Sequence, residues 1–263
     1  MAHTVPDTLM LDVSRVTVEA RPVVQQAAAI YLRHTQPWFV GLLIHGSALK
    51  GGFIPSCSDV DLQLYLDGSA FTSDGQLPLD LCLAIHRDLA MVDPAPFRYL
   101  QCVALSSTLP PDYTGPIPGA YHVIAGTLPV PEATDQQLRD AAHKALAALK
   151  PVPPFLSHAL LERGGGRLPS CVRLLCTEVW SSLYHVLALQ QGDAIGIWTL
   201  AKEEAIALLP SDMPLGREIR AFYRAAWTYY PAEESVEHAL AVIAAGVAFL
   251  RAAKSWWEEV RRP

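Results

Sequence analysis

The sequence predicts an α/β domain followed by a helical bundle, and two observations carry that prediction. In the first half, residues 38–46 form a short apolar run, and residues 59–67 alternate between polar and aliphatic side chains. A period of two is typical of a β-strand. From about residue 132 onward, apolar residues recur at intervals of three and four, which is the spacing of amphipathic helices. We therefore expect strands in the first half and helices in the second.

The other elements of the first half follow from the same patterns. Residues 19–34 carry apolar side chains on one helical face and predict an amphipathic helix before the first strand. A Gly-Ser turn after that strand can lead into a short helix. The remaining predicted elements are a helix over 77–92, a strand over 97–107, a proline-rich loop over 110–118 and a strand or an extended segment over 120–128.

Capping and breaking residues delimit the helices of the second half. Thr134 is suited to cap a helix that runs to residue 150, and the proline run at 151–155 breaks it. The further predicted helices cover 168–192, 198–209, 213–230 and 233–259. The change of pattern near residues 128–133 predicts two domains, 1–130 and 131–263.

Composition limits the classes of function. The 263 residues are 51% hydrophobic and 17% charged, which indicates a folded, soluble protein. A net charge of −6 argues against nonspecific nucleic-acid binding. The five cysteines contain no CxxC pair, so we expect free thiols. We find no signal-type N-terminus and no apolar run of membrane length, since the longest is short and flanked by charge. We therefore expect a cytoplasmic protein without a membrane partner.

Asp59 and Asp61 form the motif that carries chemistry. They lie two apart on the predicted strand 59–67, so both side chains leave the same face. Two adjacent carboxylates repel each other, and a divalent cation between them removes that cost. Mg²⁺ prefers such oxygen ligands and completes its shell with water and phosphates. An isolated Asp-x-Asp pair on a solvated edge strand would have no such meaning.

The turn before the pair supplies groups suited to a phosphate. Gly46 lets the backbone approach a ligand closely, and Ser47 offers a hydroxyl and a backbone N–H. Lys50 is either a phosphate contact or a solvated charge, and His45 is either a buried, hydrogen-bonded histidine or a catalytic one.

The segment "GSALKGGFIPSCSDVDLQLYL" resembles the nucleotidyltransferase superfamily that includes DNA polymerase β, and most closely the streptomycin and spectinomycin adenylyltransferases. The segment "VRLLCTEVWSSLYHVLALQQGDAIGIWTLAKEEAIALLP" resembles the long helix of that branch and the Lys-x-x-Ala helix after it. The resemblance implies a mixed β-sheet in a nucleotidyltransferase-fold domain, followed by a helical substrate-binding domain. It also implies Asp59 and Asp61 as metal ligands, with Gly46, Ser47 and Lys50 at the phosphates of ATP.

One position departs from the family pattern. Such enzymes take a third carboxylate from a later strand, and the aligned position here is Gln101. An amide neither accepts a proton usefully nor binds Mg²⁺ as a carboxylate does. Either the alignment is shifted, or another acid such as Asp93 or Glu178 substitutes, or activity has been lost.

The long helix offers two candidate substrate residues. Glu178 is a candidate catalytic acid and, with Trp180, a candidate contact for a cationic substrate, although aromatic residues at helical spacing are usually core. The glycine-rich segment 163–169 lacks the ending of a P-loop and predicts an interhelical loop, whose arginines could otherwise reach phosphates.

The sequence thus supports a Mg²⁺-dependent transferase that moves AMP from ATP to a hydroxyl of a small molecule. The leading acceptor is an aminoglycoside, which would make the activity one of antibiotic resistance. Two alternatives stay open: a nucleotidyltransferase fold that binds or regulates without catalysis, and an enzyme that modifies a protein. The acidic balance makes RNA the least suitable target.

Overall fold

The computed structural model describes residues 10–107, 109, 113–162, 164–231 and 235–261, and these fall into two compact units. The first unit runs through Phe53 and resumes at Ser58–Ala133. The second takes the chain from Thr134 onward and also the short segment Ile54–Cys57. Nothing in the sequence pattern indicates that this segment belongs to the helical unit.

The first unit is built on a four-stranded mixed sheet, as expected. Its strands are β1 (Phe39–His45), β2 (Val60–Leu66), β3 (Leu100–Ser106) and β4 (Tyr121–Gly126), in the spatial order β3-β2-β1-β4. The central strand β1 is antiparallel to both β2 and β4, and β2 pairs with β3 in parallel. The three predicted strands are thereby confirmed, and the segment 120–128, predicted as a strand or an extended segment, contains the fourth strand.

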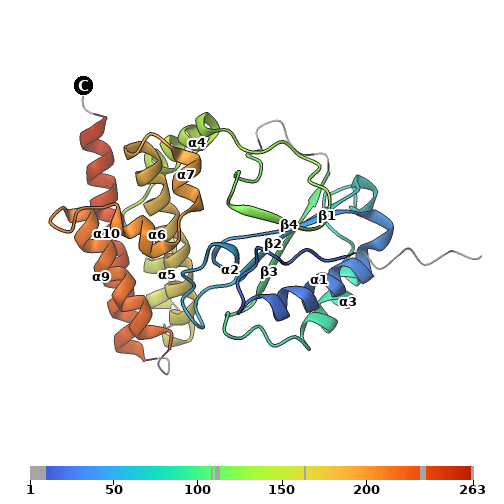
Figure 1. Ribbon diagram of the computed structural model, residues 1–263. Coiled ribbons are helices and arrows are strands. Elements are labelled where there is room, and N and C mark those ends of the chain that lie inside the picture. Colours follow the sequence, from blue (N-terminus) through green and yellow to red (C-terminus); the bar gives the residue numbers. More distant parts are fainter. Residues whose placement is uncertain (1–9, 108, 110–112, 163, 232–234, 262–263) are drawn as a thin grey trace, which may run out of the picture. The chain divides into compact units, whose positions relative to one another are not determined.

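Helices cover one face of this sheet. The helices of the unit are α1 (Arg21–Thr35), the single turn α2 (Ser47–Lys50) and α3 (Leu79–Leu89). Figure 1 shows α1 and α3 on the same side of the strands. The aliphatic set of β2, Val60, Leu62 and Leu64, is buried in one cluster with α1 and with Ile85 of α3. By alternation, Asp61 and Gln63 project to the opposite face.

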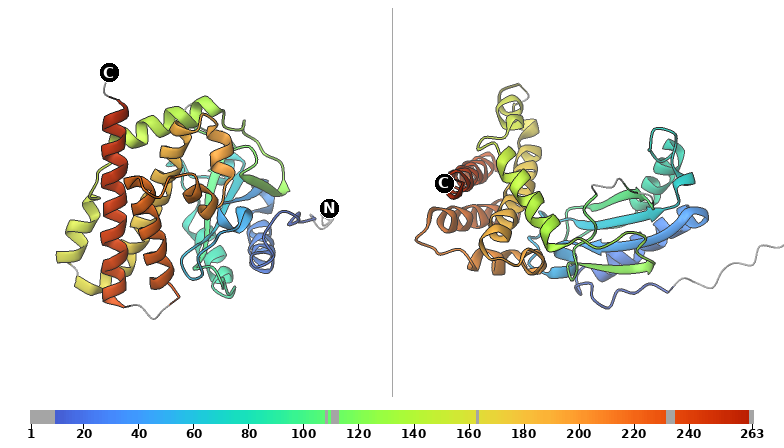
Figure 2. Two further views of the ribbon diagram at one scale, coloured as in Figure 1. Left: turned by 60° about the vertical axis from the view of Figure 1, so that its left-hand side comes forward. Right: turned by 90° about the horizontal axis from the view of Figure 1, so that it is seen from above.

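The second unit is a bundle around α6 (Figures 1 and 2). Its helices are α4 (Asp135–Ala148), α5 (Pro154–Glu162), α6 (Leu168–Gln190), α7 (Ala194–Thr199), α8 (Lys202–Ala207), α9 (Pro214–Tyr229) and α10 (Val236–Val260). Thr134 caps α4 as predicted, because its hydroxyl accepts the backbone N–H of Gln137 at 3.2 Å.

Two helix predictions need correction. The proline run indicated only a break, but α5 begins at Pro154, since proline is well suited to the first turn of a helix. The segment 198–209 was predicted as one helix and lies in two, α7 and α8, with Leu200 extended between them. Asp193 caps α7 by accepting from the backbone N–H of Gly196, and Glu204 accepts from Ala201 at the start of α8.

Helix α10 contains an apolar stretch of membrane length, which the sequence reading did not identify. An 18-residue window within its 25 residues has a mean hydropathy of 1.6, so by length and composition alone it would qualify as a membrane span. Its packing is that of a core helix, because Val242, Phe249 and Leu250 are fully buried in the bundle. At Gly246, an added Cβ would come within 2.6 Å of Cδ2 of Leu175, so the helix lies in close contact with α6.

Candidate active site

Four side chains form a row across one face of the sheet. The register pairs Asp61 of β2 with His45 of β1 and with Gln101 of β3, and it pairs His45 with Tyr121 of β4. Residues paired in this way project to the same face. This face is opposite to the one that packs on α1. The structure therefore places Gln101 beside Asp61 on this face.

The turn after β1 lies directly against the carboxylate of Asp61. Gly46 adopts φ +74° and ψ −157°, a region of backbone conformation that only glycine occupies readily. A Cβ at this position would overlap Oδ2 of Asp61 and lie 3.2 Å from its Cγ. The Gly-Ser turn and the Asp-x-Asp strand are thus brought together, as the motif predicted.

The groups around the turn fit a cation and a phosphate. Ser47 begins α2 and is buried, and Lys50 ends that helix. Asp59 lies one residue before β2 and Asp61 lies inside it. Two carboxylates with a serine hydroxyl nearby are a donor set suited to Mg²⁺ and the oxygens of a phosphate chain. Among the described residues, no group of three or more His, Cys, Asp or Glu side chains could hold a metal ion.

His45 is a neutral group at physiological pH. The pKa of His45 is lowered from 6.5 to about 4, chiefly by burial and also by the charge of Lys50, while the charge of Asp59 acts in the opposite direction. The latter two effects place Lys50 and Asp59 close to this ring. This environment favours the interpretation of a buried, uncharged histidine over one that exchanges a charge near neutral pH.

Neither acid proposed to replace the third carboxylate lies in this row. Asp93 precedes β3, and its carboxylate accepts the backbone N–H of Ala95 at 3.0 Å, which is a turn-stabilising role. Glu178 belongs to α6 of the helical unit. Gln101 is exposed and stands at the register position where an acid was expected.

Glu178 and Trp180, the two candidate substrate residues of α6, lie on different sides of the helix. Two residues along a helix differ by about 200° around its axis, so Glu178 and Trp180 lie on nearly opposite sides. Trp180 packs against Phe222 and Tyr223, with ring centres 5.2 and 6.0 Å apart, and Nζ of Lys202 lies 5.7 Å from the centre of its ring. Glu178 is exposed and, with Lys150 and His185, lines a cavity of about 440 Å³. The structure does not bring the two residues into one pocket.

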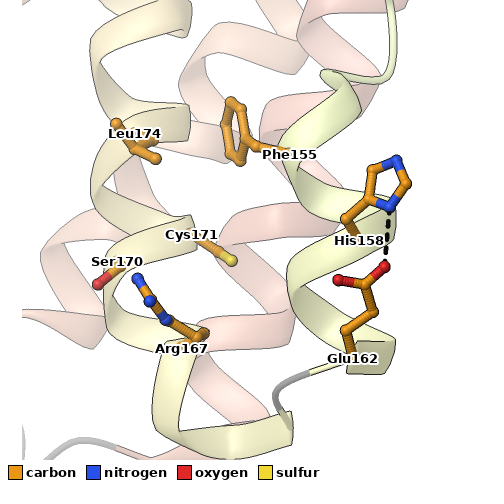
Figure 3. A pocket seen from close by; sticks show the side chains of 7 residues that line it. All are labelled: Phe155, His158, Glu162, Arg167, Ser170, Cys171 and Leu174. Atoms are coloured by element: carbon orange, nitrogen blue, oxygen red, sulfur yellow. Dashed lines mark hydrogen bonds and ion pairs between the residues drawn. The ribbon is translucent and has the colours of Figure 1, made fainter.

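The glycine-rich segment contributes Arg167 to the lining of a second cavity in the helical unit (Figure 3). Gly164–Arg167 is a short 3-10 helix that leads directly into α6, and residue 163 lies outside the described part of the chain. Arg167 lines a cavity of about 340 Å³ between α5 and α6. On its α5 side, Nδ1 of His158 pairs with Glu162 at 3.1 Å. This cavity belongs to the helical unit itself and contains no residue of the Asp-x-Asp motif.

Tyr121 is the member of the row that sequence reasoning missed. Its hydroxyl donates to Glu132 at 2.8 Å, and burial together with this carboxylate raises the pKa of Tyr121 to about 12. The segment 120–128 was predicted as a strand or an extended segment, without a place in the sheet. Its position beside β1, which places Tyr121 next to His45, follows from strand order, and no local pattern specifies that order.

We predict that replacing Gly46 with alanine costs more stability than the same change at Gly51. Both glycines have similar dihedral angles, so both variants lose about 1 kcal/mol or more through backbone strain. Only Gly46 has a neighbour, the carboxylate of Asp61, whereas a Cβ on Gly51 would meet nothing within 4 Å. Overpacking should add about 1–3 kcal/mol to the loss at Gly46, measured by urea unfolding. Equal losses in the two variants would contradict the close approach.

We also predict a pH dependence of stability from His185. Burial lowers its pKa from 6.5 to about 4, so between these values the unfolded chain binds a proton that the folded chain does not. The free energy of unfolding should therefore fall as pH falls through this window. Between pH 7 and pH 5, the wild type should lose about 2 kcal/mol more than His185→Gln. His45 titrates in both proteins and cancels in the comparison. Parallel pH profiles would show that His185 is not buried as described.

The chain resembles a known protein in its structure but not in its sequence. No family model matches the chain, and no curated protein matches it. A solved structure of spectinomycin adenyltransferase AAD(9) from Enterococcus faecialis, with ATP and spectinomycin, is similar with a TM-score of 0.50 at 13% sequence identity. The match covers 88% of this chain and 99% of that one. The chain therefore shares, at a distance, the fold of a nucleotidyltransferase, with an α/β N-terminal part and a helical C-terminal part.

Proposed function

We propose that this protein transfers AMP from ATP to a hydroxyl group of a small molecule, with Mg²⁺ bound by Asp59 and Asp61. The observation that carries the proposal is the approach of the Gly46 turn to the Asp61 carboxylate, which joins a phosphate-binding turn to a metal-binding strand. The fold likeness supports it, because the similar protein was solved with ATP and spectinomycin. An aminoglycoside is accordingly the leading acceptor.

The residues of the first unit have distinct roles in this mechanism. Asp59 and Asp61 hold Mg²⁺, which when bound neutralises charge on the phosphate oxygens. The Gly46 turn and Ser47 position the phosphate chain through a backbone N–H and a hydroxyl. Lys50, near His45, adds positive charge on the same side. The acceptor hydroxyl attacks the α-phosphorus in line with the leaving pyrophosphate, so that the new O–P bond forms as the bond to pyrophosphate breaks, and the hydroxyl proton passes to water.

Helix α6 carries the two candidate contacts for the acceptor, Glu178 and Trp180. Glu178 is the stronger candidate of the α6 pair, because an exposed carboxylate on a cavity suits a cationic ligand. Trp180 presents less free surface, since its ring packs between α9 residues and Lys202. A hydroxyl acceptor on a protein would use the same phosphate chemistry.

A second function is favoured by Gln101. The proton of the acceptor hydroxyl needs a base, and the residue paired with Asp61 is an amide. On this account the protein binds nucleotide and Mg²⁺ without transferring AMP, and acts as a binding or regulatory protein. The two functions share the metal site and differ only in whether pyrophosphate is released.

We predict that Asp61→Asn abolishes Mg²⁺-dependent ATP binding under either function. The amide keeps the shape of the side chain beside Gly46 but removes the charge that holds the cation, so affinity should fall at least tenfold while the circular dichroism spectrum is unchanged. Calorimetric titration with ATP and Mg²⁺ measures this without an acceptor. The matched control is Asp74→Asn, an exposed carboxylate of the same unit. Wild-type affinity in Asp61→Asn would refute the metal site.

We further predict that Gln101→Glu separates the two functions. It places a carboxylate next to Asp61, where it can bind metal and accept a proton. Pyrophosphate release is measured with ATP, Mg²⁺ and a panel of aminoglycosides and other hydroxylated acceptors. If the wild type releases no pyrophosphate and Gln101→Glu does, the result supports the binding protein. Release by the wild type supports the transferase, and the variant should then be at least as fast.

A further inference from the structure

The outward side of α10 is apolar, like its buried side. Val242, Phe249 and Leu250 pack in the bundle, yet only 39% of the apolar 18-residue window of this helix is buried. Figure 2 shows α10 along the outer edge of the helical bundle. A surface helix normally carries polar or charged side chains on the side that faces water. Here, no charged residue occurs between Glu237 and Arg251.

The apolar residues on this side, which we call the α10 face, recur at helical spacing. They are exposed or half-buried: Val236, Leu240, Ala241, Ala244, Val247 and Ala248. Val236 is 61% exposed and Leu240 is 48% exposed, so large apolar side chains meet water here. Continuous exposed apolar surface of this kind is typical of interaction sites. The alanines at the centre are small, so the axis of a second helix can approach this part of α10 closely.

We propose that the α10 face binds the α10 face of a second copy of this chain, with the two helices antiparallel about a two-fold axis at Ala244. Glu237 and Arg251 each lie seven residues from Ala244, one toward either end of the helix. In a two-fold interface, if one residue contacts another across the axis, the reverse contact also forms. The pairing therefore brings Glu237 of each copy opposite Arg251 of the other, so that two ion pairs flank an apolar centre.

Helix geometry places both charges on the α10 face. Fourteen residues separate Glu237 from Arg251, which is close to four turns of 3.6 residues, so both side chains leave the helix on nearly the same side as Ala244. Both residues are exposed, and neither side chain forms an ion pair with another described residue. A second copy can therefore engage these charges without breaking an existing contact.

A second copy fits this face better than a lipid surface does. Helices that lie on membranes carry a polar side rich in Lys and Arg, and anionic lipids attract them. The chain has a net charge of −6, and the opposite side of α10 is packed in the bundle. An unrelated protein partner would not require Glu237 and Arg251 at equal distances from Ala244, whereas a two-fold pairing does.

The test measures the mass of the full-length protein in solution, without ATP or an acceptor, so its result is independent of the proposed function. Analytical ultracentrifugation over a dilution series should show a monomer–dimer equilibrium for the wild type. Ala244→Glu places a like charge from each copy at the axis, so the dimer dissociation constant should rise about tenfold or more. Ala244 is exposed, so the variant should keep its melting temperature. The matched control is Ala29→Glu, at an exposed alanine within α1, which should dimerise like the wild type.

Charge reversal tests the antiparallel pairing itself. Glu237→Arg and Arg251→Glu should each weaken the dimer, because each creates two like-charge pairs across the axis. The variant that carries both changes restores opposite charges and should recover most of the wild-type affinity. The proposal would be overturned by a wild type that stays monomeric throughout the dilution series, by a dimer that Ala244→Glu leaves intact, or by a double variant that associates no more tightly than the single ones. Wild-type monomers that bind phosphatidylcholine vesicles would likewise overturn it in favour of a lipid surface.

Discussion

The close approach of the Gly46 turn to the carboxylate of Asp61 is the constraint on which the site depends. A side chain at position 46 would occupy the space of that carboxylate, and the dihedral angles there are suited to glycine. The strand that carries Asp61 must therefore pair in one register with β1, because a slip by one residue would turn the aspartate toward the aliphatic core under α1. The position of the Asp61 carboxylate thus depends on both the sheet register and the conformation of the turn, and a change in either would displace it.

The fixed register also separates the two faces of the sheet, so that one face can carry polar side chains while the other packs against helices. One face buries Val60, Leu62 and Leu64 against helices and supplies the stability of the first unit. The other face is free to carry His45, Asp61 and Gln101 in a row. Adjacent carboxylates repel each other, and a ligand that brings positive charge would remove that repulsion. Gln101 completes the row with an amide, which cannot act as a base.

The sequence predicted the strands, most of the helices and the meeting of the Gly-Ser turn with Asp61, because each leaves a local signal in the alternation of residues 59–67 and in the turn. It did not predict the position of Tyr121, which depends on strand order, or the insertion of Ile54–Cys57 into the helical core. It grouped Glu178 with Trp180 by proximity in sequence, although helical geometry places them on different sides. Features set by long-range packing leave little trace in a single chain.

The most direct test of the metal site is a crystal structure of the full chain with Mg²⁺ and a nonhydrolysable ATP analogue. The account predicts an ion bound by both Asp59 and Asp61 at about 2.1 Å, with phosphate oxygens at the Gly46–Ser47 turn. A nucleotide bound elsewhere, or an ion that contacts neither carboxylate while the turn stays empty, would contradict it.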